Sequence, residues 1–200
     1  MTRLGMVIDL KLCIACNACT VACKAENGTP PDVFWGRVLE REEGKYPTAR
    51  RIMIPVLCNH CQDPPCLRAC PTGATIQRED GIVDVDYDNC AGCKACITAC
   101  PYDARFFVEN LKGYFGDSLT PYEMVSYRRH QEGVVEKCNF CTDRVHAGLQ
   151  PACVQVCPTS CRHFGDLDDP LSEVSQLLRN RNHFQLLSSL GTKPSVYYFL

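Results

Sequence analysis

Short apolar runs separated by turn residues predict a set of small strands along this chain. Residues 3–10 form a mostly apolar run and predict a buried strand at its start. Two further strands are expected over residues 34–39 and 51–57, with a turn near Gly44. Residues 72–78 and 82–86 are strand-like and flank Asp80-Gly81, a pattern typical of a β-hairpin. A last strand-like run covers residues 194–200.

Helical periodicity is confined to short segments. The best-defined helix covers residues 171–180, where Val174, Leu177 and Leu178 share one face after the start signal at residues 168–170. Residues 20–22 and 143–148 are also expected to be helical. Residues 122–129 are expected to form a short helix or an extended arm.

Sixteen of the 17 cysteines fall into four groups, and the clearest group reads Cys90-x2-Cys93-x2-Cys96-x3-Cys100-Pro101. This is the bacterial ferredoxin spacing for a [4Fe–4S] cluster. The short gaps let three thiolates reach three corners of one cubane from a single turning loop, while the fourth typically ligates a different cluster. Zinc sites usually space two cysteine pairs well apart, so the spacing favours iron and sulfide.

Three further groups follow the same logic with different gaps. We number the motifs I to IV along the chain, with Cys90–Cys100 as motif III. Proline follows the last cysteine of motifs II, III and IV, whereas Lys24 follows that of motif I. The other motifs are Cys13-x2-Cys16-x2-Cys19-x3-Cys23 (I), Cys58-x2-Cys61-x4-Cys66-x3-Cys70 (II) and Cys138-x2-Cys141-x11-Cys153-x3-Cys157 (IV).

Two simpler interpretations of these cysteines fit less well. A disulfide framework suits a small secreted domain, but the cysteine count is odd and one spacing recurs four times. The first ten residues are interrupted by Arg3 and Asp9 and do not form a signal peptide. A zinc-bound structural protein would need closed tetrahedral sites and would be colourless and redox-silent.

Two residues near the motifs have both a functional and a simpler interpretation. His60, between Cys58 and Cys61, could tune a cluster through a hydrogen bond, but packing against its loop is favoured. Cys161 is the odd cysteine. Because Pro158 marks Cys157 as the ligand, Cys161 is expected to be a buried, inert thiol.

Charge and hydropathy narrow the function further. The formal net charge is −2, so there is no basic excess to favour nucleic acid. The sequence has no apolar run of about eighteen residues, so no membrane-spanning helix is expected. The chain offers neither a nucleophile–base pair nor a G-x-G-x-x-G loop, so no substrate chemistry is expected on it. Each cubane with four thiolates would add a charge of about −2, which backbone N–H groups and nearby Lys or Arg must offset.

The four motifs in this order, with gaps 2-2-3, 2-4-3, 2-2-3 and 2-11-3, resemble the four-cluster iron–sulfur subunit of the DMSO reductase superfamily of membrane-bound molybdenum oxidoreductases. The resemblance covers most of the chain and is nearest to the polysulfide and thiosulfate reductase type. Lys24 after motif I belongs to that pattern. Two departures are Cys161, where the family often has a small residue, and an insertion over residues 102–137 that looks longer than usual. The supporting stretches are residues 6–10, 22–28, 57–61, 70–74, 100–105 and 164–167.

The resemblance implies an α+β fold of two ferredoxin-like halves, with loop and strand insertions and a C-terminal tail. Motif II would pair with motif III, and motif I with motif IV. The expected segments are 1–57 (motif I and a first insertion), 58–105 (the unit of motifs II and III), 106–165 (a second insertion and motif IV, packing with motif I) and 166–200 (a docking tail). No ligand position is lost and the only tryptophan is Trp35, so four [4Fe–4S] clusters are expected. The implied ligands are Cys13, Cys16, Cys19 and Cys157 (cluster A); Cys138, Cys141, Cys153 and Cys23 (cluster B); Cys58, Cys61, Cys66 and Cys100 (cluster C); and Cys90, Cys93, Cys96 and Cys70 (cluster D).

The resemblance also implies a relay of electrons between a molybdopterin catalytic subunit and a quinone-reactive membrane subunit, with no catalysis on this chain. The complex would be peripheral to a membrane, on the periplasmic face by co-export with its partner or on the cytoplasmic face. Two alternatives remain: an autonomous soluble polyferredoxin, and the equivalent subunit of a formate dehydrogenase or hydrogenase complex.

Overall fold

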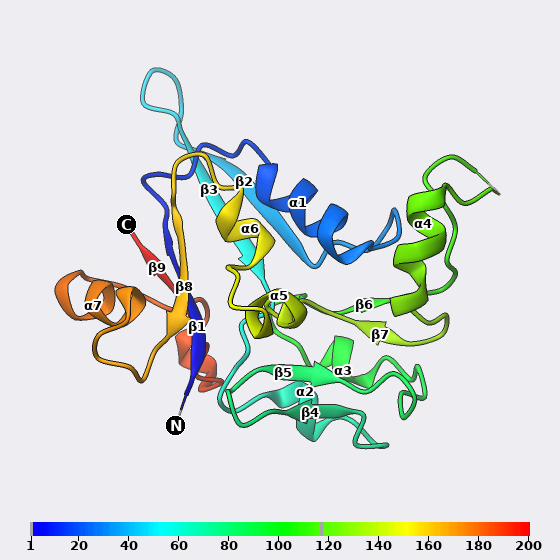
Figure 1. Cartoon of the computed structure of the whole chain (residues 1–200). Coiled ribbons are helices and arrows are strands. Elements are labelled where there is room, and N and C mark those ends of the chain that lie inside the picture. The colour runs from blue at the N-terminus through cyan, green and yellow to red at the C-terminus, as the bar shows by residue number, and fades with distance from the viewer. Residues whose placement is uncertain (1, 117) are drawn as a thin grey trace.

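Strands from the two ends of the chain meet in one sheet of the computed structural model, which describes residues 2–116 and 118–200. The central strand β1 (Leu4–Asp9) pairs antiparallel with β8 (Arg162–Asp166) and parallel with β9 (Val196–Phe199). Both chain ends therefore lie on the side of the molecule that carries this sheet (Figure 1). The expectation of a closing strand at the apolar terminus is confirmed.

The central strand is apolar on both faces because both faces are covered. Met6 and Ile8 belong to the main core, whereas Val7 packs with Val174 of α7 (Glu173–Asn180). A strand buried on both sides reads as a continuous apolar run instead of an alternating one. This is why residues 3–10 predict a strand without period-two alternation.

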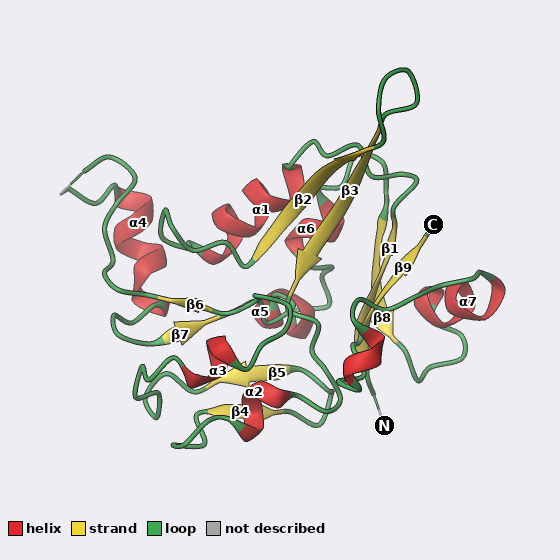
Figure 2. Cartoon of the chain, turned by 180° about the vertical axis from the view of Figure 1, so that it is seen from behind, coloured by secondary structure: helices red, strands yellow, loops and turns green. Residues whose placement is uncertain are grey.

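A long hairpin projects from the sheet end of the molecule (Figure 2). It pairs β2 (Gly36–Glu43) with β3 (Arg50–Leu57) in antiparallel register. Its base is buried and its charged tip is exposed. The hydroxyl of Tyr198 donates a hydrogen bond of 3.0 Å to the carbonyl of Pro55 and joins this hairpin to β9.

Short helices pack in pairs beside the cysteine motifs. α1 (Ala18–Asn27) lies against α6 (Ala152–Gln155), and α2 (Pro65–Arg68) lies against α3 (Ala95–Thr98). The predicted hairpin around Asp80-Gly81 is present and packs beside the second helix pair (Figure 1). Its strands are β4 (Thr75–Gln77) and β5 (Val83–Val85).

The long insertion folds as a small hairpin and a helix. β6 (Phe106–Phe107) pairs with β7 (Val135–Glu136), and α4 (Pro121–Ser126) lies between them in the chain. A capping box fixes the start of α4: Thr120 accepts from the Glu123 backbone, and the Glu123 carboxylate accepts from Thr120 in return. The remaining elements are α5 (Thr142–His146) and two 3₁₀ turns, Tyr127–Arg129 and Ser188–Leu190.

The predicted elements are present, but several boundaries differ: the strand expected over residues 34–39 spans Gly36–Glu43, and the one expected over 72–78 is limited to Thr75–Gln77. The segment at residues 20–22 extends to ten residues in α1, and the ambiguous segment at 122–129 is helical. α7 begins after Ser172, whose hydroxyl accepts from the Ser175 N–H, and not at residues 168–170. The structure adds elements that the hydrophobic pattern does not predict: β6, β7, β8 and the helices α2, α3 and α6.

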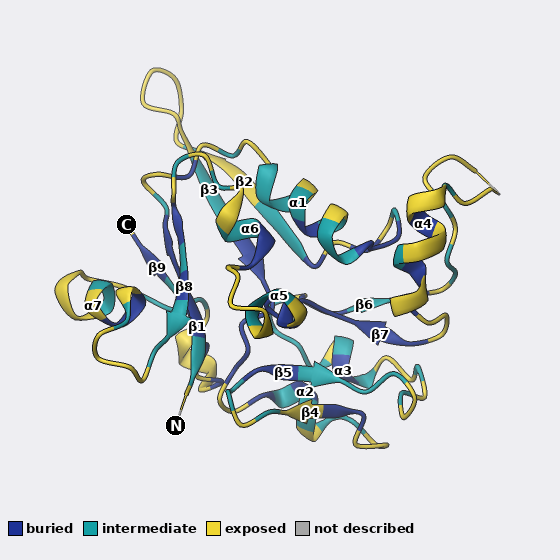
Figure 3. Ribbon diagram, in the orientation of Figure 1, coloured by how far each residue is buried: buried dark blue, intermediate teal, exposed yellow. Residues whose placement is uncertain are grey.

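The combination of short helices and small, mostly antiparallel sheets makes the fold α+β. Burial concentrates where the sheet, the long hairpin and the cysteine loops meet, and the hairpin tip and the outer faces of α4 and α7 are exposed (Figure 3). Across residues 2–116 and 118–200, no helix combines the length and apolarity needed to cross a bilayer.

Removing the Tyr198 hydroxyl tests whether the join between β9 and the long hairpin stabilises the fold. Tyr198→Phe leaves the buried carbonyl of Pro55 without its donor, which costs about 1–3 kcal/mol. We expect the apparent Tm of anaerobic holo-protein to fall by about 2–4 °C for each kcal/mol. Tyr197→Phe, one residue earlier on the partly exposed face of β9, is the control and should leave Tm unchanged. Equal shifts in both variants would contradict the role of this hydrogen bond.

Candidate metal centres

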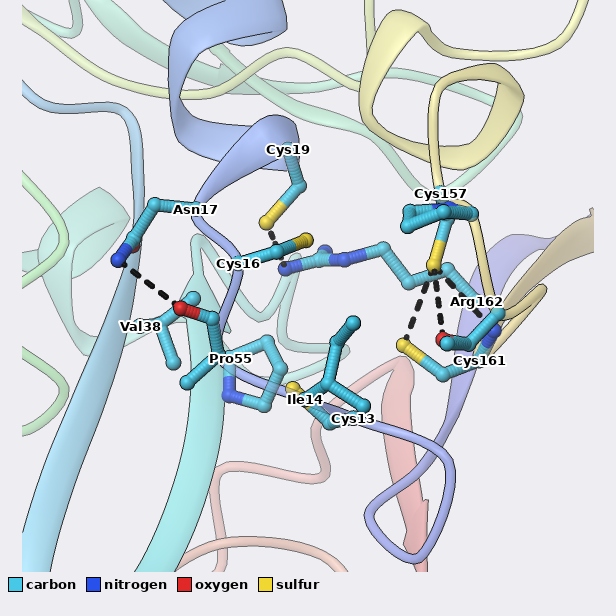
Figure 4. Close-up of a pocket in the computed structure, with 13 residues that line it drawn as sticks. Cys13, Ile14, Cys16, Asn17, Cys19, Val38, Pro55, Cys157, Cys161 and Arg162 are labelled. Carbon is cyan, nitrogen blue, oxygen red and sulfur yellow. Dashed lines mark hydrogen bonds between the residues drawn. The ribbon is translucent and has the colours of Figure 1, made fainter.

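All 17 cysteines carry free thiols, and sixteen of them gather into four sets that each draw on two motifs. Set A is Cys13, Cys16 and Cys19 of motif I together with Cys157 of motif IV. These four line one hollow of about 300 Å³ between the start of α1, the long hairpin and the loop after α6, and Cys161 lines it too. In Figure 4 the Cys19 and Cys157 side chains flank Arg162, with Cys16 beside Cys19.

Sets C and D form two similar hollows around motifs II and III. The set C cysteines line a hollow of about 320 Å³, and the set D cysteines line one of about 300 Å³. Each hollow again combines three cysteines of one motif with the last cysteine of the other. The members are Cys58, Cys61, Cys66 and Cys100 (set C) and Cys90, Cys93, Cys96 and Cys70 (set D).

Set B is as buried as set C: each has three buried thiols and one that is partly buried. Its members are Cys23 of motif I with Cys138, Cys141 and Cys153 of motif IV, and three of them (Cys23, Cys138 and Cys153) pack in the main core. The side-chain amide of Asn27 lies 3.6 Å from the sulfur of Cys23 and 3.8 Å from that of Cys141. One amide therefore contacts thiols of motif I and motif IV together.

The loops converge because each motif has a left-handed residue two positions after its first cysteine. These residues are Ala15, His60, Gly92 and Phe140, with φ between 40° and 63°. Three of them are not glycine, and a left-handed residue with a side chain stores strain. That strain is consistent with a loop whose shape is set by what its thiols must bind.

Burial raises the pKa of seven of these sixteen thiols. It raises that of Cys61 to about 12 and that of Cys153 to about 11, and it holds that of Cys138 well above its usual value. A metal binds the thiolate form of cysteine. Loading these sites must therefore remove the thiol protons and leave negative charge inside the protein.

The two cysteines that precede Pro-Thr behave differently. Burial alone would raise the pKa of Cys70, but hydrogen bonds from Thr75 and Thr72 lower it to about 7. The pKa of Cys157 is also lowered, against its partial burial, by hydrogen bonds from Thr159 and Cys161. The Cys161 N–H and thiol lie 3.3 Å and 3.4 Å from the Cys157 sulfur.

The residues present fit an iron–sulfur cluster in each set. Soft thiolates are the donors that such clusters use. Within residues 2–116 and 118–200, no three His, Cys, Asp or Glu side chains converge on the position of a single ion, and the thiols instead surround hollows. Two buried guanidinium groups, those of Arg105 and Arg162, point at these thiols. A buried cation requires negative charge beside it, which metal-bound thiolates supply.

The structure also shows the surroundings of His60 and Cys161, the two residues for which the sequence allowed both a functional and a simpler interpretation. His60 is fully buried, stacks on Phe140 with ring centroids 3.8 Å apart, and accepts a hydrogen bond from the Val83 N–H. It is a packing residue between motifs II and IV, as favoured from the sequence. Cys161 is buried as expected, and its backbone N–H donates to the sulfur of Cys157.

Sequence reasoning did not identify Asn27, Arg105 or Arg162. A signal for the arginines was present, because Cys-Pro-x-x-x-Arg occurs both at Cys100 and at Cys157. Asn27 carries no such signal, since its contact with motif IV joins residues 114 positions apart.

A family model described as a 4Fe-4S dicluster domain matches residues 49–115 and 116–167 of this chain. The match includes motifs II, III and IV. The first matched segment contains all of sets C and D, and the second contains the motif IV members of sets A and B.

Several curated proteins are similar over almost the whole chain. A protein of Halobacterium salinarum, provisionally named as an iron-sulfur subunit of dimethyl sulfoxide reductase, is 43% identical, over 99% of this chain and 79% of its own length. A selenate reductase subunit of Mesobacillus selenatarsenatis is 42% identical, over 96% and 70%. The arsenate respiratory reductase iron-sulfur subunit of a Shewanella species is 40% identical, over 98% and 95%. The chain therefore belongs to the family of iron–sulfur subunits of molybdoenzyme complexes.

Proposed function

We propose that this chain carries four [4Fe–4S] clusters in a row and relays electrons between two partner subunits of a respiratory oxidoreductase. The clusters would be ligated by sets A, B, C and D, with the last cysteine of every motif serving the paired motif. When bound, the clusters supply one-electron transfer. The chain itself holds, spaces and insulates them.

The order of the sets supports a linear relay. Arg162 contacts set A and acts electrostatically on Cys153 of set B, so these sets are neighbours. Arg105 joins sets C and D in the same way. Sets B and C share the main core, in which Cys58 and Cys138 pack with Phe140. The order A, B, C, D follows.

Exposure of the thiols carries the proposal. Set A contains the exposed Cys16 and set D the exposed Cys93, whereas sets B and C have no exposed cysteine. A row that reaches the surface at its two ends and is buried in its middle suits transfer between two different partners.

The partners are proposed from the family. One would be a molybdopterin catalytic subunit and the other a quinone-reactive membrane subunit, so that the complex is peripheral to a membrane. The names of similar subunits refer to selenate, arsenate and dimethyl sulfoxide, at 40–43% identity. We propose that this chain belongs to a complex of the polysulfide or thiosulfate reductase type. The same kind of electron-transfer subunit would suit several different catalytic subunits.

The first test is the composition and reducibility of the anaerobically isolated complex. We expect about sixteen iron and sixteen sulfide per chain, a molybdopterin-containing subunit that co-purifies, and reduction of the clusters by a quinol analogue. A chain that holds all its clusters, purifies alone and is not reduced by the quinol analogue would be an autonomous ferredoxin. A folded chain with little iron would end the proposal altogether.

Crossed ligation is tested with matched serine variants. Cys157→Ser and Cys16→Ser should remove the same EPR signal of the reduced protein, because both residues belong to set A. Cys141→Ser should remove a different signal. If Cys157→Ser instead removes the signal lost in Cys141→Ser, motif IV is not crossed. Cys161→Ser is the control: Cys161 lines the same hollow, with its sulfur 3.4 Å from that of Cys157, but it is not a proposed ligand, so the variant should keep about sixteen iron.

A glycine in motif III tests how closely the loop around set D is confined. A Cβ on Gly92 would lie 2.1 Å from the carbonyl oxygen of Gly133, so Gly92→Ala must displace the loop that carries Cys90 and Cys93. We expect iron content to fall toward about twelve per chain. Gly73→Ala has a similar φ but open space, so it should cost about 1 kcal/mol and keep its iron. Equal iron loss in both variants would assign the effect to the dihedral angle alone.

A further inference from the structure

Two buried arginines occupy equivalent places in the two halves of the cysteine framework. Each lies five residues after the last cysteine of a motif, in the pattern Cys-Pro-x-x-x-Arg. Arg105 is 3% exposed and Arg162 is 4% exposed. Side chains of this type are almost never buried unless they are paired, so each position requires an explanation.

Arg105 lies between sets C and D. Its Nη2 donates to the sulfur of Cys66 in set C at 3.1 Å, and its Nη1 donates to the hydroxyl of Thr75 at 3.1 Å. Thr75 also lines the hollow of set D, and its N–H donates to the sulfur of Cys70 in that set at 3.5 Å. One guanidinium therefore contacts set C directly and set D through Thr75.

Arg162 has the same relation to sets A and B. Its Nη2 donates to the sulfur of Cys19 in set A at 3.4 Å (Figure 4). Its Nη1 lies 3.5 Å from the sulfur of Met6. Arg162 is also the first residue of β8, which packs against α6, the helix that carries Cys153 of set B. Its Nε is buried without a hydrogen-bond partner in the described part of the chain.

Among the described residues, neither arginine has a carboxylate partner. Other arginines form ion pairs, such as Arg144 with Glu26 at 2.9 Å, but within residues 2–116 and 118–200 Arg105 and Arg162 form none. Their nearest polar contacts are sulfur atoms and one hydroxyl. Removing an unpaired charge from water is costly, so the compensating negative charge must come from the thiolates once they hold metal.

We propose that Arg105 and Arg162 are shared counter-charges, each favouring the reduced state of both clusters in its half of the relay. Adding an electron to a cluster increases its negative charge, and a fixed cation nearby stabilises that form most strongly where the dielectric constant is low. Because one cation faces two clusters, it raises both potentials together and offsets the repulsion between neighbouring reduced clusters. The inference rests on the proposed ligation of the four sets.

The test is a mediated redox titration of the cluster-loaded full chain in its complex, with dithionite as the electron donor. Each cluster takes up one electron and no bond is made or broken. Arg105→Met should lower two of the four potentials, and Arg162→Met should lower the other two. We expect the ratio of reduced to oxidised cluster at a fixed potential to fall at least tenfold, which for a one-electron centre is about 59 mV.

Controls separate local charge from net charge and from packing. Arg128→Met makes the same change in net charge at an exposed position and should move no potential. Arg105→Lys and Arg162→Lys keep the charge and should stay nearer the wild-type potentials than the methionine variants do. If a methionine variant loses the iron of both its sets while the lysine variant loads fully, the charge is required for loading, which supports the proposal.

Three results would overturn the shared counter-charge. These are unchanged potentials in the methionine variants, a shift of only one cluster per variant, and loss of iron from the lysine and methionine variants alike. Iron content of the wild-type chain is measured first. A value far below sixteen would refute the four-cluster function itself, a failure distinct from any result with the arginine variants.

Discussion

One helical turn between the third and fourth cysteine of every motif joins neighbouring thiol sets. Residues four apart on a helix lie on the same face, about 5–6 Å apart. Cys19 and Cys23 stand in this relation on α1 and belong to sets A and B. Cys66 and Cys70 do the same around α2 for sets C and D. Within each half, the spacing between neighbouring sets is therefore fixed by helical geometry and not by flexible loops.

This constraint also explains why the short helices pack in pairs. Two sets need two bridging turns, one from each motif of a half, and these turns must lie side by side. α1 lies against α6, and α2 against α3. The sheet of β1, β8 and β9 and the long hairpin then enclose the first pair, while the β4–β5 hairpin supports the second.

The cysteine motifs were predictable from the sequence because nearly all of their gaps are short, of two, three or four residues. The grouping of two motifs into each set was implied by the family resemblance and not by the gaps. Strands such as 3–10 and 51–57 were equally visible, since their apolar runs match buried strands. β8 was not, because it begins Arg162-His163 and its buried first residue contacts the sulfur of Cys19, 143 positions away. Asn27 is hidden for the same reason, since its contact joins two distant motifs. The two arginines share the local pattern Cys-Pro-x-x-x-Arg, but the pattern does not tell which thiols they contact.

The buried cations complete the argument from charge. Lys137 is buried, and its ammonium donates to the carbonyls of Val83 and Cys138, where the motif II–III half meets motif IV. Like the two arginines, it forms no ion pair with a carboxylate among the described residues. In the order proposed for the sets, Arg162, Lys137 and Arg105 would follow one another, each near two neighbouring sets. Buried cations in these positions would suit the proposed relay, because at each step the electron would stay close to a fixed positive charge.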